Sequence, residues 1–180
     1  AICEAAERLA WNRNIPLEEQ RTYDRAFHQA IGLCWHDEVI RRFVFAARFA
    51  RMAAELLDVD GVRLYHDQAL VKPAGGGPTP WHQDAYYWPL DGGSAITMWM
   101  ALCDIPTEVG SMVFADGTNQ RGDLRGPAIS DESEDHFAGL VAEEAFPTST
   151  HGAMQAGDAT FHAAWTLHSA GPNPSDRDRP

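Results

Sequence analysis

The segment Trp81-His82-Gln83-Asp84 contains the residue types in this sequence that are best suited to metal chemistry. On a strand, residues two apart point to the same face, so His82 and Asp84 would present an imidazole and a carboxylate side by side. His168, far downstream, could add a second imidazole from another strand. Two histidines and one carboxylate on one face of an octahedron leave three positions open. This arrangement is typical of non-haem Fe(II) oxygenases.

The pattern His-x-Asp is weak evidence when it stands alone. With 8 His and 26 acidic residues in the chain, roughly one such pair is expected by chance. A second pair, in His36-Asp37-Glu38, lies in a helical region where residues two apart diverge, and it indicates solvated helix surface. The alternative for His82 and Asp84 is a hydrogen-bonded pair at the end of a strand.

The surroundings of this pair favour a metal site. A loop rich in glycine and proline, 73–80, precedes it and could open a site to solvent. Three aromatic residues, 86–88, follow and could wall a pocket. His168 is followed by Arg177 and Arg179, and the planar guanidinium of an arginine can bind a dicarboxylate through two hydrogen bonds while the other end of that molecule chelates the metal.

The elements that must position these residues divide the chain in two. Helical periodicity predicts helices over 2–10, about 17–32, and 39–57, the last with an apolar stripe from Val39 to Leu57. From residue 62 the pattern predicts short strands at 62–65, 69–71, 82–88, 95–103, 111–114, 159–162 and 166–169. Residues 117–139 are polar and rich in turn formers, which predicts a surface excursion. Many short strands between Gly/Pro turns indicate a sandwich or barrel.

Composition limits the classes of partner. The net charge is −12, and the basic residues are 13 scattered Arg and one Lys, so we predict neither nucleic-acid nor anionic-membrane binding but a small-molecule substrate. The three cysteines are widely spaced without a CxxC pair, which favours a reducing compartment and predicts a cytoplasmic protein. The apolar stretches fall short of the roughly 20 residues that span a bilayer, and no signal peptide is visible.

From about Leu64 to the C-terminus the sequence resembles the phytanoyl-CoA dioxygenase family. The resemblance implies a mainly β fold with α-helices, a double-stranded β-helix (jelly roll, cupin-like) with N-terminal helices packed against it. It implies a single domain over 1–180, with a helical support region at 1–61 and a core that holds the metal site at 62–180, shorter at both ends than is usual in the family. The motifs that carry it are Thr79-Pro80-Trp81-His82-Gln83-Asp84, Trp88-Pro89, Trp99 to Pro106, Gly110 to Phe114, Gly157-Asp158 and His168 to Asn173 with Arg179.

The resemblance also implies roles for individual residues. His82, Asp84 and His168 would bind Fe(II), and Arg179 would bind the carboxylate of 2-oxoglutarate, with Arg177 as the second candidate. Gln68 and Trp99 fall where relatives line the cosubstrate pocket. The implied reaction uses O2 and 2-oxoglutarate to hydroxylate a C–H bond of a small metabolite, with release of succinate and CO2. Related halogenases carry a small residue at the position equivalent to Asp84, so a carboxylate here argues for hydroxylation, or another oxidation such as desaturation, over halogenation.

Three further residues are candidates for the pocket. Tyr86 shares strand parity with His82 and Asp84, which predicts that Tyr86 faces the pocket and that Tyr87 is packed elsewhere. His66, close to Gln68, is a further candidate for the cavity wall. His162 is most simply a core histidine satisfied by hydrogen bonds, with a place beside the metal ligands as the alternative.

Two departures from the family pattern bear on the expected cosubstrate geometry, and two other functions stay open beside the leading one. Ala170 stands where many members carry Ser or Thr, and Gly117-Thr118-Asn119 replaces the usual Gly-Ser-His. One alternative is a jelly-roll protein that binds a metabolite without turnover. The other is a cupin-like metalloenzyme that does not use 2-oxoglutarate.

Overall fold

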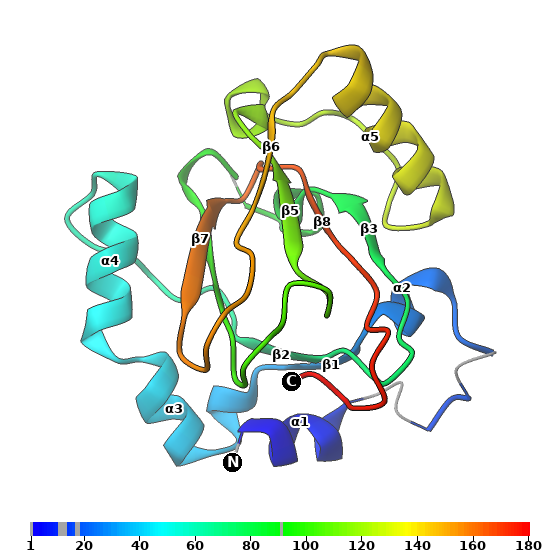
Figure 1. Ribbon diagram of the computed structural model, residues 1–180. Helices are drawn as coiled ribbons and strands as arrows, with labels where there is room; N and C mark the ends of the chain where they lie inside the picture. The colour runs from blue at the N-terminus through cyan, green and yellow to red at the C-terminus, as the bar shows by residue number, and fades with distance from the viewer. Residues whose placement is uncertain (1, 11–13, 17–18, 91) are drawn as a thin grey trace.

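The computed structural model describes residues 2–10, 14–16, 19–90 and 92–180, with strands in the middle of the molecule and helices around them (Figure 1). The 3-10 turns named below are η2 (Leu33–Trp35), η3 (Asp84–Tyr87) and η5 (Thr118–Arg121). The helices are α1 (Ile2–Leu9), α2 (Thr22–Ala26), α3 (Glu38–Val44), α4 (Ala47–Leu57) and α5 (Asp131–Glu143). The strands are β1 (His28–Ile31), β2 (Gln68–Val71), β3 (Thr79–His82), β4 (Ile96–Met100), β5 (Met112–Ala115), β6 (Thr148–Thr150), β7 (Ala159–Ala163) and β8 (His168–Ala170).

All of these strands pair antiparallel. One sheet has the order β3-β8-β5-β6, while β4 pairs with β7 and β1 pairs with β2. Residues of β3, β8, β4 and β7 line one cavity, so the larger sheet and the β4-β7 pair enclose it from two sides. The predicted mainly β architecture with helices is therefore confirmed.

The N-terminal region differs from the prediction of continuous helices. Residues 17–18 of the predicted helix 17–32 lie outside the described residues, and the rest forms α2 and then the strand β1. The backbone becomes extended at Phe27, and β1 pairs along its whole length with β2. Gly32, at φ +72°, then makes the turn into η2. Pairing with a strand forty residues away has overridden local helix propensity, so this part of the prediction is wrong.

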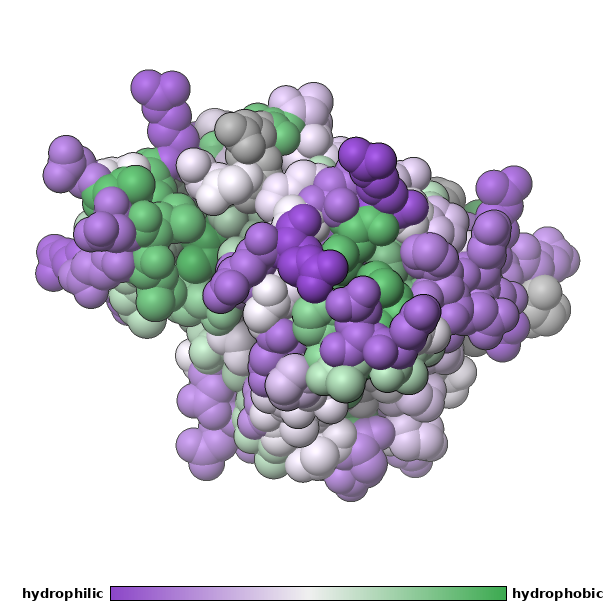
Figure 2. Space-filling model, turned by 90° about the horizontal axis from the view of Figure 1, so that it is seen from above, coloured by the Kyte–Doolittle hydropathy of each residue, from purple (hydrophilic) through white to green (hydrophobic). Residues whose placement is uncertain are grey.

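The predicted helix 39–57 is two helices. α3 begins at the N-cap Asp37, whose carboxylate accepts from the backbone N–H groups of Val39 and Ile40. It ends at Val44, and the extended Ala46 starts α4. The apolar stripe is only partly covered: Ile40 is buried but Val39 is exposed, and no residue of α4 is buried. Figure 2 shows the resulting green patch on the left, on the side where α4 lies.

The strand predicted over 82–88 ends early. β3 stops at His82, Gln83 is still extended, and residues from Asp84 form η3. Alternation therefore holds for His82, Gln83 and Asp84 but not beyond. Gln83 points away from the site and its side-chain amide is buried. The amide nitrogen donates to the carbonyl oxygens of Gly122 and Trp165, and the amide oxygen accepts from the N–H of Leu124. The strand predicted at 62–65 is likewise irregular chain.

Helix α5 and η5 replace part of the surface excursion predicted at 117–139. Ser130 caps α5, because its hydroxyl accepts from the Ser133 N–H while the Ser133 hydroxyl accepts from the Ser130 N–H. The buried face of α5 carries Phe137, which packs in one apolar cluster with Trp81 and Leu167. Trp81 precedes His82, and Leu167 precedes His168. Strand alternation thus buries one residue of each pair under α5 and turns the histidine to the other face.

A carboxylate of α5 also satisfies the backbone of β3. The N–H of Trp81 donates to Oε2 of Glu134 at 3.0 Å. We predict that Glu134→Ala lowers the free energy of unfolding by about 1–3 kcal/mol, because this partly buried donor loses its acceptor. Urea denaturation measures the change. The matched control is Glu132→Ala, an exposed acid in the same first turn; equal losses in the two variants would show that the bond to Trp81 contributes nothing.

Candidate metal centre

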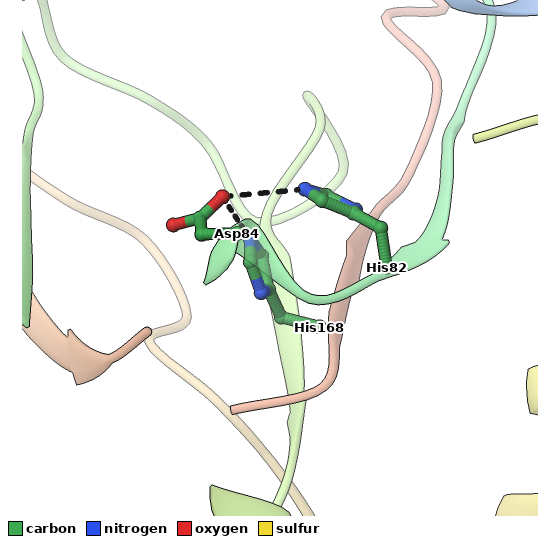
Figure 3. A group of neighbouring side chains, drawn as sticks. All are labelled: His82, Asp84 and His168. Carbon is green, nitrogen blue, oxygen red and sulfur yellow. Dashed lines mark ion pairs between the residues drawn. The ribbon is translucent and has the colours of Figure 1, made fainter. Parts of the chain in front are cut away.

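His82, Asp84 and His168 lie together, as Figure 3 shows, with one ligand atom from each within 4.8 Å of the others. His82 ends β3 and His168 begins β8, and the two are direct partners across the antiparallel pair. Their ring centroids are 4.2 Å apart. Asp84, the first residue of η3, reaches back toward both rings. The fold brings the three predicted ligands to one place.

Backbone carbonyls fix which nitrogen of each ring faces the centre. Nδ1 of His82 donates to the carbonyl oxygen of Pro80 at 2.8 Å, and Nδ1 of His168 donates to that of Thr166 at 3.0 Å. Because a carbonyl oxygen only accepts, each Nδ1 carries the proton and each Nε2 has a free lone pair. The two Nε2 atoms lie 3.7 and 3.9 Å from Oδ1 of Asp84.

The other oxygen of Asp84 is held by two donors. The hydroxyl of Thr97, on β4, donates to Oδ2 at 2.7 Å. Nε2 of His162, on β7, contacts the same oxygen at 3.1 Å and is therefore the protonated nitrogen of that ring. Oδ2 is engaged with the β4-β7 pair, so Oδ1 is the oxygen left to face the two imidazoles. The carboxylate is oriented to offer one atom to a metal.

Burial sets the charges of this group. Burial lowers the pKa of His82 and brings that of His168 down to about 3, so both imidazoles are neutral at pH 7. Burial opposes the charge of Asp84, but His168, His162 and His82 around it outweigh this and lower its pKa. Two neutral imidazoles and one carboxylate are the protonation states in which these side chains bind a divalent metal.

The centre opens into a cavity of about 540 Å³. Basic side chains, Lys72 and Arg179, line one part of it. Both are buried, and Nε of Arg179 has no hydrogen-bond partner within the part of the chain that the structure describes. Aromatic side chains also line the cavity: Tyr23, Phe27, Tyr65, Tyr87 and Trp88.

Comparison with known proteins decides the family. The phytanoyl-CoA dioxygenase (PhyH) family model matches residues 1–180. The chain belongs to this family. The predicted enzyme class, a non-haem iron and 2-oxoglutarate-dependent dioxygenase, is confirmed. A comparison with curated proteins gives no match.

Solved structures agree with this assignment. The epimerase SnoN, in complex with Fe3+, alpha ketoglutarate and nogalamycin RO, is 32% identical with a TM-score of 0.73, over 98% of this chain and 71% of SnoN. The alpha ketoglutarate-dependent carbocyclase SnoK is 26% identical with a TM-score of 0.70, over 85% of this chain and 60% of SnoK. EctD from S. alaskensis, at 19% identity and a TM-score of 0.66, over 84% of this chain and 52% of EctD, shares the fold. The predicted jelly-roll class is confirmed.

Of the other predicted site residues of this dioxygenase, some line the cavity and some do not. His66, Gln68, Trp99 and Arg179 line the cavity. Arg177 does not, and its side chain is 90% exposed beside Asp176. Tyr86 lies outside the cavity wall and is half exposed, whereas Tyr87 lines the cavity. The placement of these two tyrosines was predicted wrongly, because helical geometry after Asp84 ends the alternation on which the prediction rested.

Sequence reasoning missed several residues of the site. Thr97 gave no signal, since its contact with Asp84 depends on how β4 packs. For His162 the sequence favoured a core histidine over a place beside the metal ligands; the side chain is buried, contacts Asp84 and lines the cavity. Lys72 did carry a signal, because it is the single lysine among 14 basic residues and lies beside a Gly/Pro loop.

Across the described residues, no helix is both long and apolar enough to cross a bilayer.

The bond from Thr97 to Asp84 has a measurable consequence. We predict that Thr97→Val weakens Fe(II) binding about 10-fold, because residues that orient a metal ligand typically contribute 10- to 100-fold to affinity. Anaerobic titration of Fe(II) against a chromogenic chelator measures this. Thr97→Ser keeps the hydroxyl and is the matched control. If the valine and serine variants bind Fe(II) equally tightly, the hydrogen bond does not orient Asp84.

Proposed function

We propose that this dioxygenase uses Fe(II) and 2-oxoglutarate to hydroxylate a C–H bond of a small molecule with a flat, apolar face. The observation that carries the proposal is the layout of one cavity. A two-histidine, one-carboxylate centre with a single free carboxylate oxygen shares one cavity with buried cations and with aromatic side chains.

The donor set fits ferrous iron. Nε2 of His82, Nε2 of His168 and Oδ1 of Asp84 would hold the ion, and nitrogen and oxygen donors of this kind are those of the Fe(II) oxygenases. When bound, Fe(II) together with 2-oxoglutarate and O2 supplies the oxidising power for C–H cleavage, and 2-oxoglutarate leaves as succinate and CO2. Thr97 and His162 keep the second oxygen of Asp84 occupied, which preserves open positions on the metal.

We infer that Arg179 binds the carboxylate of 2-oxoglutarate that is remote from the metal. Its guanidinium lies 5.5 Å above the ring of Trp99, and that ring is stacked on His151. Nε2 of His151 in turn accepts from the backbone of Met112. A buried guanidinium held in one orientation suits bidentate binding of a planar carboxylate. Gln68 and Trp99 would form the walls beside the cosubstrate.

The aromatic part of the cavity would bind the substrate. The ring centroids of Tyr65 and Trp88 lie 5.8 Å apart. The rings of Tyr23 and Phe27 pack edge to face, with their centroids 5.0 Å apart. The pKa of His66 is lowered by burial, so its imidazole adds a neutral surface beside Trp88. Apolar and aromatic walls favour a ligand with little charge. The complex of SnoN with nogalamycin RO supports a small-molecule substrate. The net charge of −12 disfavours nucleic acid and polyphosphate partners.

Epimerisation is the second candidate, favoured by the 32% identity to an epimerase. Both reactions begin with removal of a hydrogen from carbon. They differ in whether oxygen or hydrogen is then returned to the substrate. Product mass separates them: hydroxylation adds one oxygen atom, whereas epimerisation leaves the mass unchanged and exchanges a hydrogen.

We also propose that residues 1–180 form one domain, with 1–61 supporting the core at 62–180. β1 pairs with β2 over their full length, and one apolar cluster unites α1, β1 and β2.

A cytoplasmic location is proposed as well. Its support is that Cys3, Cys34 and Cys103 are all free thiols.

The test of the function does not need the substrate. Anaerobic addition of Fe(II) and 2-oxoglutarate to the protein is expected to give a weak visible charge-transfer band, because the cosubstrate chelates the metal. His82→Ala is expected to abolish it by removing a ligand. A folded wild-type protein without the band would refute the proposal and favour a 2-oxoglutarate-independent metalloenzyme. A band without succinate release in any substrate screen would favour a binding protein.

The two arginines near the C-terminus allow a matched comparison. We predict that Arg179→Ala weakens 2-oxoglutarate binding by about 10- to 100-fold, the value of a charged hydrogen-bonded contact. Fe(II) affinity is expected to stay near that of the wild type. Arg177→Ala, at an exposed position two residues away, is expected to change neither. Titration of the charge-transfer band gives the dissociation constant, and a larger effect from Arg177 than from Arg179 would reverse the assignment.

A further inference from the structure

Two cations are buried side by side at the basic part of the cavity. Lys72, directly after β2, is 1% exposed and Arg179 is 8% exposed. The two residues are direct partners in an antiparallel bridge, with reciprocal N–H to carbonyl bonds of 2.8 Å in each direction. Directly opposite residues of an antiparallel pair send their side chains to the same face, with Cβ atoms about 4.5–5.5 Å apart. The backbone pairing therefore places the ammonium of Lys72 and the guanidinium of Arg179 on the same face as neighbours.

This pair lacks a counter-charge. No carboxylate among the described residues forms an ion pair with either side chain, and Nε of Arg179 is buried without a partner. Burial, together with the charge of Arg179, lowers the pKa of Lys72 to about 7. Like charges placed opposite one another destabilise a sheet, and buried cations without a partner are costly. An anion in the cavity would offset both effects.

The ammonium of Lys72 has a donor to spare. Nζ donates to the carbonyl oxygen of Gly77 at 2.7 Å and lies 3.5 Å from the hydroxyl of Thr79. An ammonium has three N–H donors, so one remains after these two contacts. Lys72 also contributes to the cavity wall.

Gly110 lets the two side chains lie this close together. A Cβ added at Gly110 would come within 2.9 Å of Cδ of Lys72 and 3.2 Å of a guanidinium nitrogen of Arg179. Gly110 also has φ +69°, which favours glycine on its own account. Both side chains therefore pass over the same glycine, and both reach the same part of the cavity.

We propose that Lys72 is a second cationic contact for the remote carboxylate of 2-oxoglutarate, beside Arg179, and that Lys72 takes up a proton from solvent as this dianion binds. The inference rests on the proposed function of the same cavity. It assigns to the single lysine of the chain a role in cosubstrate binding that depends on pH. The Arg179 contact supplies orientation, and the Lys72 contact supplies charge.

The pH dependence follows from the groups around Lys72. Arg179 is the charge that acts on Lys72, and it remains protonated near pH 7. Cys103 and His151, which interact with Arg179, are both neutral there, because burial raises the pKa of Cys103 and lowers that of His151. Lys72 is thus the member of this group that changes charge near neutral pH. A bound dianion favours the protonated amine, so 2-oxoglutarate binding is strongest below pH 7 and weakens above it.

The experiment is a titration of 2-oxoglutarate into Fe(II)-loaded protein without O2. The charge-transfer band is the readout, and the titration is repeated at several values between about pH 6 and pH 9. Wild-type affinity is expected to fall by up to about tenfold per pH unit above pH 7. Lys72→Met is expected to weaken binding about 10- to 100-fold at pH 6 and to abolish most of the pH dependence. Lys72→Arg, which keeps a charge at every pH, is expected to bind with little pH dependence.

Controls separate this role from a structural one. Fe(II) affinity in Lys72→Met is expected to match the wild type, and Cys103→Ser is expected to keep the wild-type pH profile. A wild-type affinity that does not change with pH overturns the inference, even if Lys72→Met does not fold. So does a folded Lys72→Met that binds 2-oxoglutarate as the wild type does. A wild-type protein with no band at any pH overturns the proposed function and this inference together.

Discussion

The register between β3 and β8 is the constraint on which the rest of the structure depends. Because His82 faces His168 directly, Trp81 and Leu167 are both turned to the opposite face, under α5. A slip of one residue would move every side chain of a strand to the other face. The same pairing therefore fills the apolar cluster and aims the imidazoles at Asp84. Loss of the register would expose the cluster and separate the candidate metal ligands at the same time.

The irregularity in this pairing has a chemical origin. Thr79 pairs with Ala170 and His82 with His168, so β3 has one more residue than β8 between the two pairs. Pro80 lies in this bulge, and it has no N–H to offer the ladder. Its carbonyl accepts instead from Nδ1 of His82 and fixes the tautomer of that ligand. Bulges often re-aim a side chain beside an active site, and here the residue that breaks the ladder also orients the ring.

The three candidate ligands that the sequence pointed to lie together in the structure, but the contacts that hold them were not predicted. The triad was predictable because strand alternation from His82 to Asp84 is a local property and because His168 begins a recognisable motif. Thr97 and His162 were not, since their contacts with Asp84 arise from the β4-β7 pair. Strand boundaries near Ala69, Ile96 and Met112 followed the apolar pattern. The helix predicted at 17–32 failed because β1 finds its partner in β2, and α5 was missed although Ser130 and Ser133 form a capping box.

The cavity wall combines residues of the core with residues of the N-terminal region. The metal ligands and Arg179 belong to the core sheets and the C-terminal segment, whereas Tyr23 and Phe27 come from α2 and the residue that follows it. SnoN and SnoK both depend on alpha ketoglutarate but are an epimerase and a carbocyclase. The candidate metal ligands and the proposed 2-oxoglutarate contact, which serve the step common to such enzymes, lie in the core. The product of the reaction depends on which C–H bond and which face of the substrate lie next to the metal. The aromatic side chains around the metal centre come from both regions of the chain, Tyr23 and Phe27 from the N-terminal region and Tyr65, Tyr87 and Trp88 from the core.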